Sequence, residues 1–214
     1  ASDSTTNTVI YDTDGNALVT VDSTNDLVKA GIGQHIVNTQ YAVFSNSITL
    51  TQSNTAGYHY PLQFGGGTTG GTASLSDQKN HFGNGTDPAT SFTTADATDQ
   101  RASDLISYMW YVPDAMSIDA VYSIEGADAA TGDTTRFHLM GYTFTSGSTS
   151  CLTSGALLAH NSDTTNAGSE QVYLSSWTID SAAVTAGKVI ICTFESDSIN
   201  SDHVYAVTVK YHLT

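Results

Sequence analysis

The stretch from 205 to 213 alternates with a period of two between apolar and mainly polar residues. Its apolar side carries Tyr205, Val207, Val209, Tyr211 and Leu213, and its polar side carries Thr208, Lys210 and His212. A period of two is typical of a half-buried β-strand, whereas a helix would repeat near 3.6. The same alternation recurs along the chain between segments rich in Ser, Thr, Gly, Asn and Asp. We therefore predict an all-β protein.

Several further segments carry a strand pattern. They are residues 41–51, 58–64, 118–125, 135–145, 171–179 and 188–195. Residues 135–145 are apolar on both faces, which predicts a central or interface strand. Residues 151–159 are the one segment with a helical pattern, and it is short. Strands separated by turns predict an antiparallel β-sandwich of jelly-roll-like type.

The front of the chain predicts a β-hairpin arm. Residues 9–21 alternate around a turn at 12–16 that contains Asp-Gly, a strong signal for a tight hairpin turn. A single hairpin buries too little apolar surface to be stable alone. We expect residues 1–37 to form an attachment arm that packs on a partner, and residues 38–214 to form the sandwich. The expected contact residues of the arm are Val9, Tyr11, Val19 and Val21.

Residues 65–100 predict a long loop within the sandwich. They begin with a glycine-rich run from 65 to 71 and contain few apolar residues. A connection of this length is usually functional or mobile. The run lacks the lysine that a phosphate-binding loop requires, so a flexible loop is the better interpretation.

Charge narrows the choice of partners. The chain of 214 residues has a net charge of -15, and its six basic residues are scattered. Binding to nucleic acid needs clustered Lys or Arg, so we expect no such partner. No apolar run reaches the length that spans a membrane. Residues 1–6 do not resemble a signal peptide, but a cleaved signal would leave a similar end, so secretion stays open.

The residue types that usually hold metals or form disulfides give weak signals. Residues 12–16 resemble part of a calcium loop, but the glycine comes too early and Ser23 stands where a closing Glu is needed. The seven histidines are dispersed. Cys192 lies in an apolar run and is expected to be a small buried hydrophobic residue. A bridge between Cys192 and Cys151 is left open. We expect no metal and no cofactor.

No catalytic motif is present. The chain lacks Gly-x-Ser-x-Gly, and neither cysteine has a catalytic context. A pair of carboxylates for sugar hydrolysis is left open, although the three Glu residues lie in no marked motif. We expect a protein that is not an enzyme and has no catalytic residues.

Aromatic residues offer a different kind of recognition. Flat rings can stack on the apolar faces of sugars, although in sandwiches they more often fill the core or a subunit interface. The candidate glycan contacts are Tyr58, Tyr60, Trp110, Tyr111 and Trp177. The alternative to a structural role is therefore a carbohydrate-binding sandwich, as a tail-fibre tip, a receptor-binding tip or a secreted lectin-like module.

Short motifs resemble a known family. Tyr58-His59-Tyr60-Pro61-Leu62, followed after a polar insertion by Trp110-Tyr111-Val112-Pro113-Asp114-Ala115-Met116-Ser117-Ile118, is similar to the "aromatic-x-Pro-Leu … aromatic-x-x-Pro-Asp-Gly-x-Ile" pattern of jelly-roll virion proteins of tailed marine phages. Ala186-Gly187-Lys188-Val189-Ile190 is similar to their "Ala-Gly-Asp-x-Ile" turn. The sequence departs from these patterns at Ala115 and Lys188.

The resemblance implies a function. It implies a non-enzymatic capsid decoration or cement protein, commonly a homotrimer, that is made in the host cytoplasm and resides on the capsid surface of the virion. Its partner would be the major capsid protein or another virion protein, with a host-surface glycan as the alternative ligand. The N-terminal part would grip the particle and the jelly roll would face outward.

Overall fold

The computed structural model describes residues 8–24, 27–31, 35–49, 57–65, 81–92, 106–127, 131–168, 171–197 and 202–214. Within these ranges the regular structure is β apart from a single 3₁₀ turn, η1 (Ile106–Tyr108), so the predicted all-β class is confirmed. No helix in the same ranges has the length and apolar character that a membrane crossing requires.

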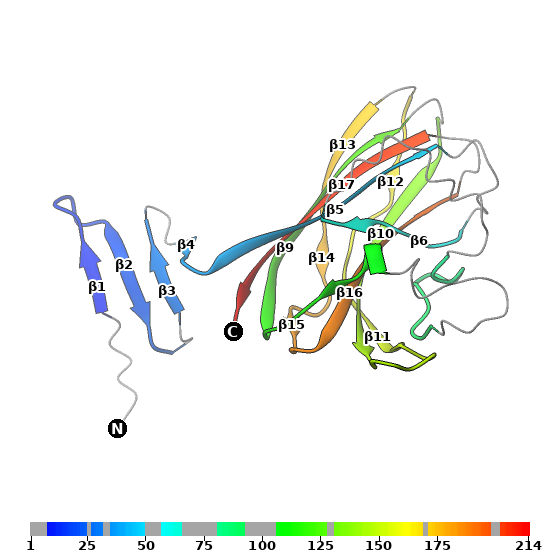
Figure 1. Ribbon diagram of the computed structural model, residues 1–214. Helices are drawn as coiled ribbons and strands as arrows, with labels where there is room; N and C mark the ends of the chain where they lie inside the picture. Colours follow the sequence, from blue (N-terminus) through cyan, green and yellow to red (C-terminus); the bar gives the residue numbers. More distant parts are fainter. Residues whose placement is uncertain are drawn as a thin grey trace.

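The N-terminal part forms a small antiparallel sheet in the order β1-β2-β3-β4. Its strands are β1 (Thr8–Tyr11), β2 (Ala17–Asp22), β3 (Leu27–Ala30) and β4 (His35–Ile36). The predicted hairpin is confirmed as β1 and β2, and the structure extends it by two strands. Figure 1 shows the small sheet beside the rest of the molecule, at the start of β5.

The rest of the described chain is a sandwich of two antiparallel sheets. The first, called here the β9 sheet, has the order β13 (Gln171–Ser176), β9 (Met116–Ala127), β17 (Asp202–Leu213), β5 (Thr39–Thr49) and β7 (Gln63–Phe64), with β15 (Ala183–Val184) also on β9. The second, the β10 sheet, has the order β14 (Thr178–Ile179), β11 (Leu152–His160), β10 (Thr134–Phe144), β16 (Lys188–Ser196) and β6 (Tyr60–Pro61), with β12 (Thr164–Thr165) on β10 and β8 (Trp110–Tyr111) on β16.

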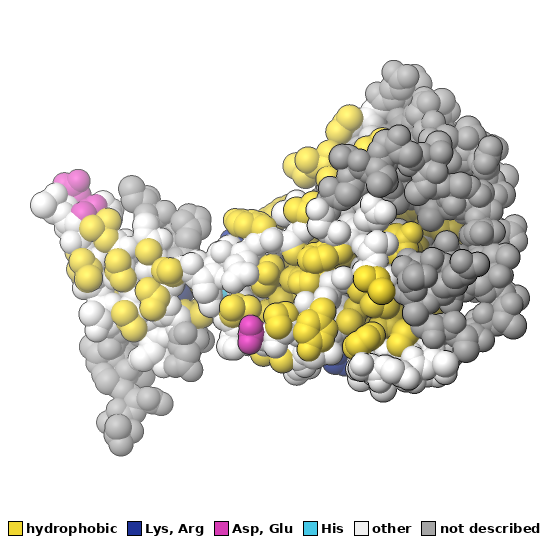
Figure 2. All heavy atoms as spheres, viewed as in Figure 1, with side chains coloured by type: hydrophobic (Ala, Val, Ile, Leu, Met, Phe, Trp, Pro, Cys, Tyr) yellow, Lys and Arg dark blue, Asp and Glu magenta, His cyan; other side chains and the backbone are white. Residues whose placement is uncertain are grey.

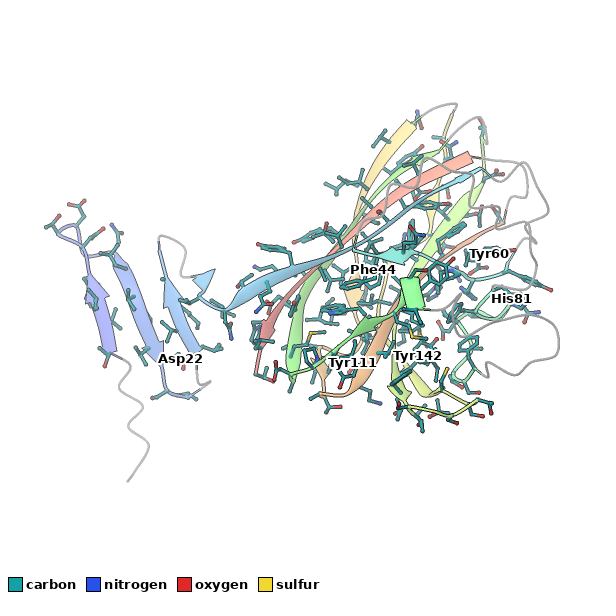
Figure 3. The ribbon with its side chains drawn as sticks, viewed as in Figure 1. Asp22, Phe44, Tyr60, His81, Tyr111 and Tyr142 are labelled. Carbon is teal, nitrogen blue, oxygen red and sulfur yellow. The ribbon has the colours of Figure 1, made fainter. Side chains whose placement is uncertain are left out.

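The main core lies between the two sheets. The apolar side of β17 faces inward, where Tyr205 and Val207 pack with Phe44 of β5 and with Phe137 and Phe194 of the β10 sheet. Removing these side chains from water supplies most of the favourable free energy of folding. In Figure 3, Phe44 and Tyr60 both lie in this layer.

A second apolar cluster covers the outer face of the β10 sheet. Met140 and Tyr142 point away from the main core and pack with Phe82. Phe82 belongs to a segment of residues 81–92, part of the predicted long loop, that lies over this face. The hydroxyl of Tyr142 donates a hydrogen bond to the carbonyl of Ala89 at 3.0 Å. Strand β10 is therefore buried on both faces, as its sequence predicts; the rest of the 65–100 loop lies largely outside the described residues.

The helix predicted at residues 151–159 is wrong, because this stretch is β11. Two register shifts interrupt its pairing with β10, and Ser154 adopts a left-handed backbone with φ of 51°. Such irregularities break strict alternation, so the apolar residues no longer repeat with a period of two.

The two apolar clusters explain why Cys151 and Cys192 form no disulfide. Both cysteines are free. Cys151 lies in the second cluster and Cys192 in the main core, on opposite faces of the β10 sheet. The prediction that Cys192 is a small buried residue is confirmed.

Candidate functional site

The small sheet presents apolar side chains on an open face. Register places Ile10 opposite Val19, and Val21 opposite Val28, so these four side chains share one face. Ile10 is 55% exposed and Val28 is 43% exposed. Figure 2 shows hydrophobic side chains gathered over this sheet. Three or more strands need a packed face for independent stability, so exposed apolar residues here favour a partner.

The predicted arm residues divide between the two faces. The extra residue of the bulge, Leu18, lies on β2, so β1 keeps its alternation and Tyr11, which pairs with Ala17, lies on the face opposite Ile10, Val19 and Val21. Val9 pairs with Thr20 and shares that opposite face with Tyr11. Ile10 and Val28 were not predicted, because alternation within one strand does not show which residues of neighbouring strands pair, and it is the register that places them with Val19 and Val21.

The opposite face of the small sheet carries a polar contact. Asp22 is buried, and its Oδ2 lies 3.2 Å from Nζ of Lys29. Its Oδ1 accepts a hydrogen bond from the backbone N–H of Thr24 at 3.2 Å. These contacts tie β2 to β3 and to the turn between them, so the sheet is internally braced although one face stays open. Figure 3 shows Asp22 far from the sandwich residues that it labels.

The hairpin turn that resembles a calcium loop is closed by its own hydrogen bonds. Oδ1 of Asp12 accepts from the backbone N–H groups of Asp14 at 2.9 Å and Asn16 at 2.7 Å, and Oδ2 accepts from the Asn16 amide at 2.9 Å. These hydrogen bonds, first those from Asn16, lower the pKa of Asp12. Among the described residues, no group of three or more His, Cys, Asp or Glu side chains is arranged to hold a metal ion.

Two histidines far apart in the sequence meet under segment 81–92. The rings of His59 and His138 are 4.9 Å apart between centroids and nearly perpendicular. Nε2 of His59 donates to the carbonyl of Gly85 at 2.7 Å, and Nε2 of His138 lies 3.6 Å from Oδ1 of Asp87. Both Nδ1 atoms are buried and have no hydrogen-bond partner. The sequence did not predict this pair. The alternation within β10 places His138 on one face of the strand but does not indicate that His59 lies next to it.

Burial controls the protonation of this pair. Loss of hydration lowers the pKa of His138 to about 3 and also lowers the pKa of His59. The nearby carboxylate of Glu195, 3.8 Å from Nε2 of His59, acts in the opposite direction but does not outweigh burial. Both imidazoles are therefore neutral near pH 7.

A shallow polar pocket of about 230 Å³ lies beside the pair. It is lined by Thr134, Thr135, Arg136, Asp163, Glu195 and Asp197. Arg136 is held by Asp163 through two hydrogen bonds of 2.6 and 2.8 Å, which raise the pKa of Arg136. Asp197 accepts hydrogen bonds from Thr134. Most of these polar groups are therefore occupied with one another, and the hollow is smaller than the usual small-molecule site.

The five aromatic residues predicted as glycan contacts do not form one surface. Tyr60, Trp110 and Trp177 are buried in the main core, so the prediction that they contact glycan is wrong. Tyr58 packs partly against the same core, and its ring is tilted against that of His81, with 4.2 Å between the ring centroids. Tyr111 alone points outward, at 55% exposed. Neighbouring residues of β8 face opposite sides, so exposure of Tyr111 entails burial of Trp110.

No protein-family model matches this sequence, and no curated protein matches it.

Proposed function

We propose that this chain is a non-enzymatic virion structural protein that decorates the head of a tailed phage. The observation that carries the proposal is the small sheet outside the sandwich, which exposes Ile10, Val21 and Val28 on one face. Its partner is the major capsid protein or another virion protein. The family resemblance of the motifs at 58–62 and 110–118 supports the same role.

Attachment would work by burying the open face of the small sheet. Apolar area removed from water contributes roughly 25 cal/mol per Å², and the polar contact of Asp22 with Lys29 keeps the sheet ordered before it docks. The sandwich would then stand on the particle surface with its own core complete. This arrangement needs no catalytic group and no cofactor.

Saccharide binding is the weaker alternative. Three of its five predicted rings lie in the core, and Tyr111 stands alone. A single exposed ring does not make a stacking platform, so we do not propose it.

Binding to particles tests the proposal. Purified full-length chain should saturate heads of the encoding phage that were assembled without it. The double variant Ile10→Asp/Val28→Asp should lose at least tenfold in affinity, because both charges would be buried in the contact. Ile106→Asp is the matched control, since Ile106 is exposed on the sandwich. Wild-type protein that fails to bind, or a double variant that binds like wild type, would contradict the proposal.

A further inference from the structure

The outer face of the β9 sheet is a broad apolar surface. Register places Leu174 of β13, Ile124 of β9 and Ala206 of β17 in one row across the sheet. These side chains alternate with the inward residues Ser123, Glu125 and Tyr205, so they point away from the core. The large exposed apolar residues on this face are Val172 (74%), Leu174 (72%), Tyr41 (65%), Val204 (58%), Ile124 (53%), Tyr122 (43%) and Val43 (38%).

The size and charge of this face suit an interface. At these exposures the seven side chains leave roughly 800 Å² open, about what one partner contributes to a standard interface. Monomeric proteins rarely expose so large an apolar patch. In the middle of the face the described side chains carry no charge, and Lys210 lies toward one end. Two copies of a chain with net charge -15 could meet here without opposing carboxylates.

Large and small residues are distributed unevenly across the face. In the row Leu174, Ile124, Ala206, Ser45, the two large residues lie on β13 and β9 and the two small ones on β17 and β5. The next row, Ser176, Tyr122, Thr208, Val43, places a large residue on β9 opposite a smaller one on β17. On the other side of the first row, Gly126 of β9 pairs with Val204 of β17.

A two-fold axis parallel to the strands, between β9 and β17, would make this face complementary in shape to the same face of a second copy. The rotation keeps each row at its level and reverses the strand order. Ile124 then lies over Ala206 of the second copy, Leu174 over Ser45, and Gly126 beneath Val204. For the pairs named in these rows, each bulky side chain meets a smaller one, as close packing of two sheet faces requires.

We propose that the outer face of the β9 sheet binds the same face of a second copy of this chain, in this two-fold arrangement. The interface is isologous, because one patch meets itself. It lies on the sandwich and uses no residue of the small sheet, so the proposal does not depend on attachment to a capsid. It differs from the trimer that the family resemblance implies.

Association in solution gives the first test. Light scattering on a size-exclusion column should show a dimer for the wild type that dissociates on dilution. Ile124→Asp should weaken the dimer at least tenfold, and Ile106→Asp should leave it unchanged. Ala206→Leu distinguishes shape complementarity from non-specific hydrophobic association. The variant makes the face more apolar, but its larger side chain fills the space opposite Ile124, so the dimer should weaken. A monomer at all concentrations, a trimer, or tighter association of Ala206→Leu would overturn the proposal.

Cross-linking tests the arrangement itself. Leu174 and Ser45 are three strands apart in one chain, about 14 Å, which is beyond the reach of dibromobimane, a short thiol cross-linker. Across the proposed axis they face each other. The variant Leu174→Cys/Ser45→Cys should therefore give a covalent dimer, and neither single variant should. The native cysteines are buried, and wild type treated in the same way controls for them. A covalent dimer from Leu174→Cys alone, or none from the double variant, would overturn the arrangement.

Discussion

His59 and His138 are two imidazoles kept neutral by burial, at a place where segment 81–92 meets the β10 sheet. Their rings contact each other, and protonation of one would place a charge where water cannot reach it. In the unfolded chain each would take up a proton near its ordinary pKa of about 6.5. The folded state resists that proton, since the pKa of His138 falls to about 3.

This difference predicts a loss of stability in acid. The stabilising effect of the neutral ring is complete above about pH 6.5 and is lost as the pH falls toward about 3, because the unfolded state then binds more protons than the folded one. The loss approaches about 1.4 kcal/mol per pH unit for one such histidine. His138→Phe keeps a ring but cannot titrate, so its melting temperature should fall less steeply between pH 6.5 and 5. Parallel slopes for the variant and the wild type would contradict this assignment.

Gly155 is required by a close approach of two segments. A Cβ at this position would lie 2.6 Å from Cε1 of Tyr142 and 2.9 Å from Cα of Thr90. Backbone cannot yield as a flexible side chain can, so Gly155→Ala should cost about 1–3 kcal/mol of unfolding free energy. At Gly168 a Cβ would make only ordinary contacts, and Gly168→Ala should change stability little. Urea denaturation of both variants gives the comparison. If Gly155→Ala were as stable as Gly168→Ala, segment 81–92 would have moved away from residue 155 to make room for the Cβ.

At the scale of elements, alternation in the sequence was enough to predict most strands. The inward side of β17 and the double burial of β10 both follow from residue pattern alone. β11 could not be predicted, since its bulges and the left-handed Ser154 depend on pairing with β10. The meeting of His59 with His138 depends on which strands become neighbours. The same holds for the aromatic residues, because the pattern within β8 does not say which of Trp110 and Tyr111 faces the core.

Segment 81–92 acts as a cover for one sheet face, and its main anchor is Phe82. Truncation by Phe82→Ala should cost about 3–5 kcal/mol, since the side chain is fully buried. The cover protects Cys151 but not Cys192, which lies in the main core. In the Phe82→Ala variant, thiol labelling under native conditions should therefore be faster than in the wild type at Cys151 and stay slow at Cys192. Simultaneous labelling of both would show that the cover and the sandwich unfold together.

At the scale of the whole molecule, the small sheet and the sandwich have separate sources of stability. The described residues of the small sheet rely on their own strand pairs, including the contact between Asp22 and Lys29, whereas the sandwich has two apolar clusters. Local free energies of opening can therefore differ greatly within one chain.

Asp22→Ala should loosen the small sheet alone. The variant loses the contacts with Lys29 and with the Thr24 amide, together worth about 1–2 kcal/mol. Hydrogen exchange followed by mass spectrometry should then speed up in β1 to β3 and stay unchanged in β16 and β17. Faster exchange in β16 would mean that the two parts unfold as one unit.

The junction between the two parts has a mechanical consequence. Only Val37 and Asn38 separate the end of β4 from the start of β5 at Thr39, and β5 pairs with β17 from Thr39 with His212 to Thr49 with Asp202. Asn38 also donates to the carbonyl of Leu213 at 2.8 Å. A pull on the small sheet would enter β5 at its end and run along the strand (Figure 1). The ladder to β17 would then be loaded in shear, with its hydrogen bonds sharing the force, and tension would have to break many of them at once to tear the sandwich from its anchor.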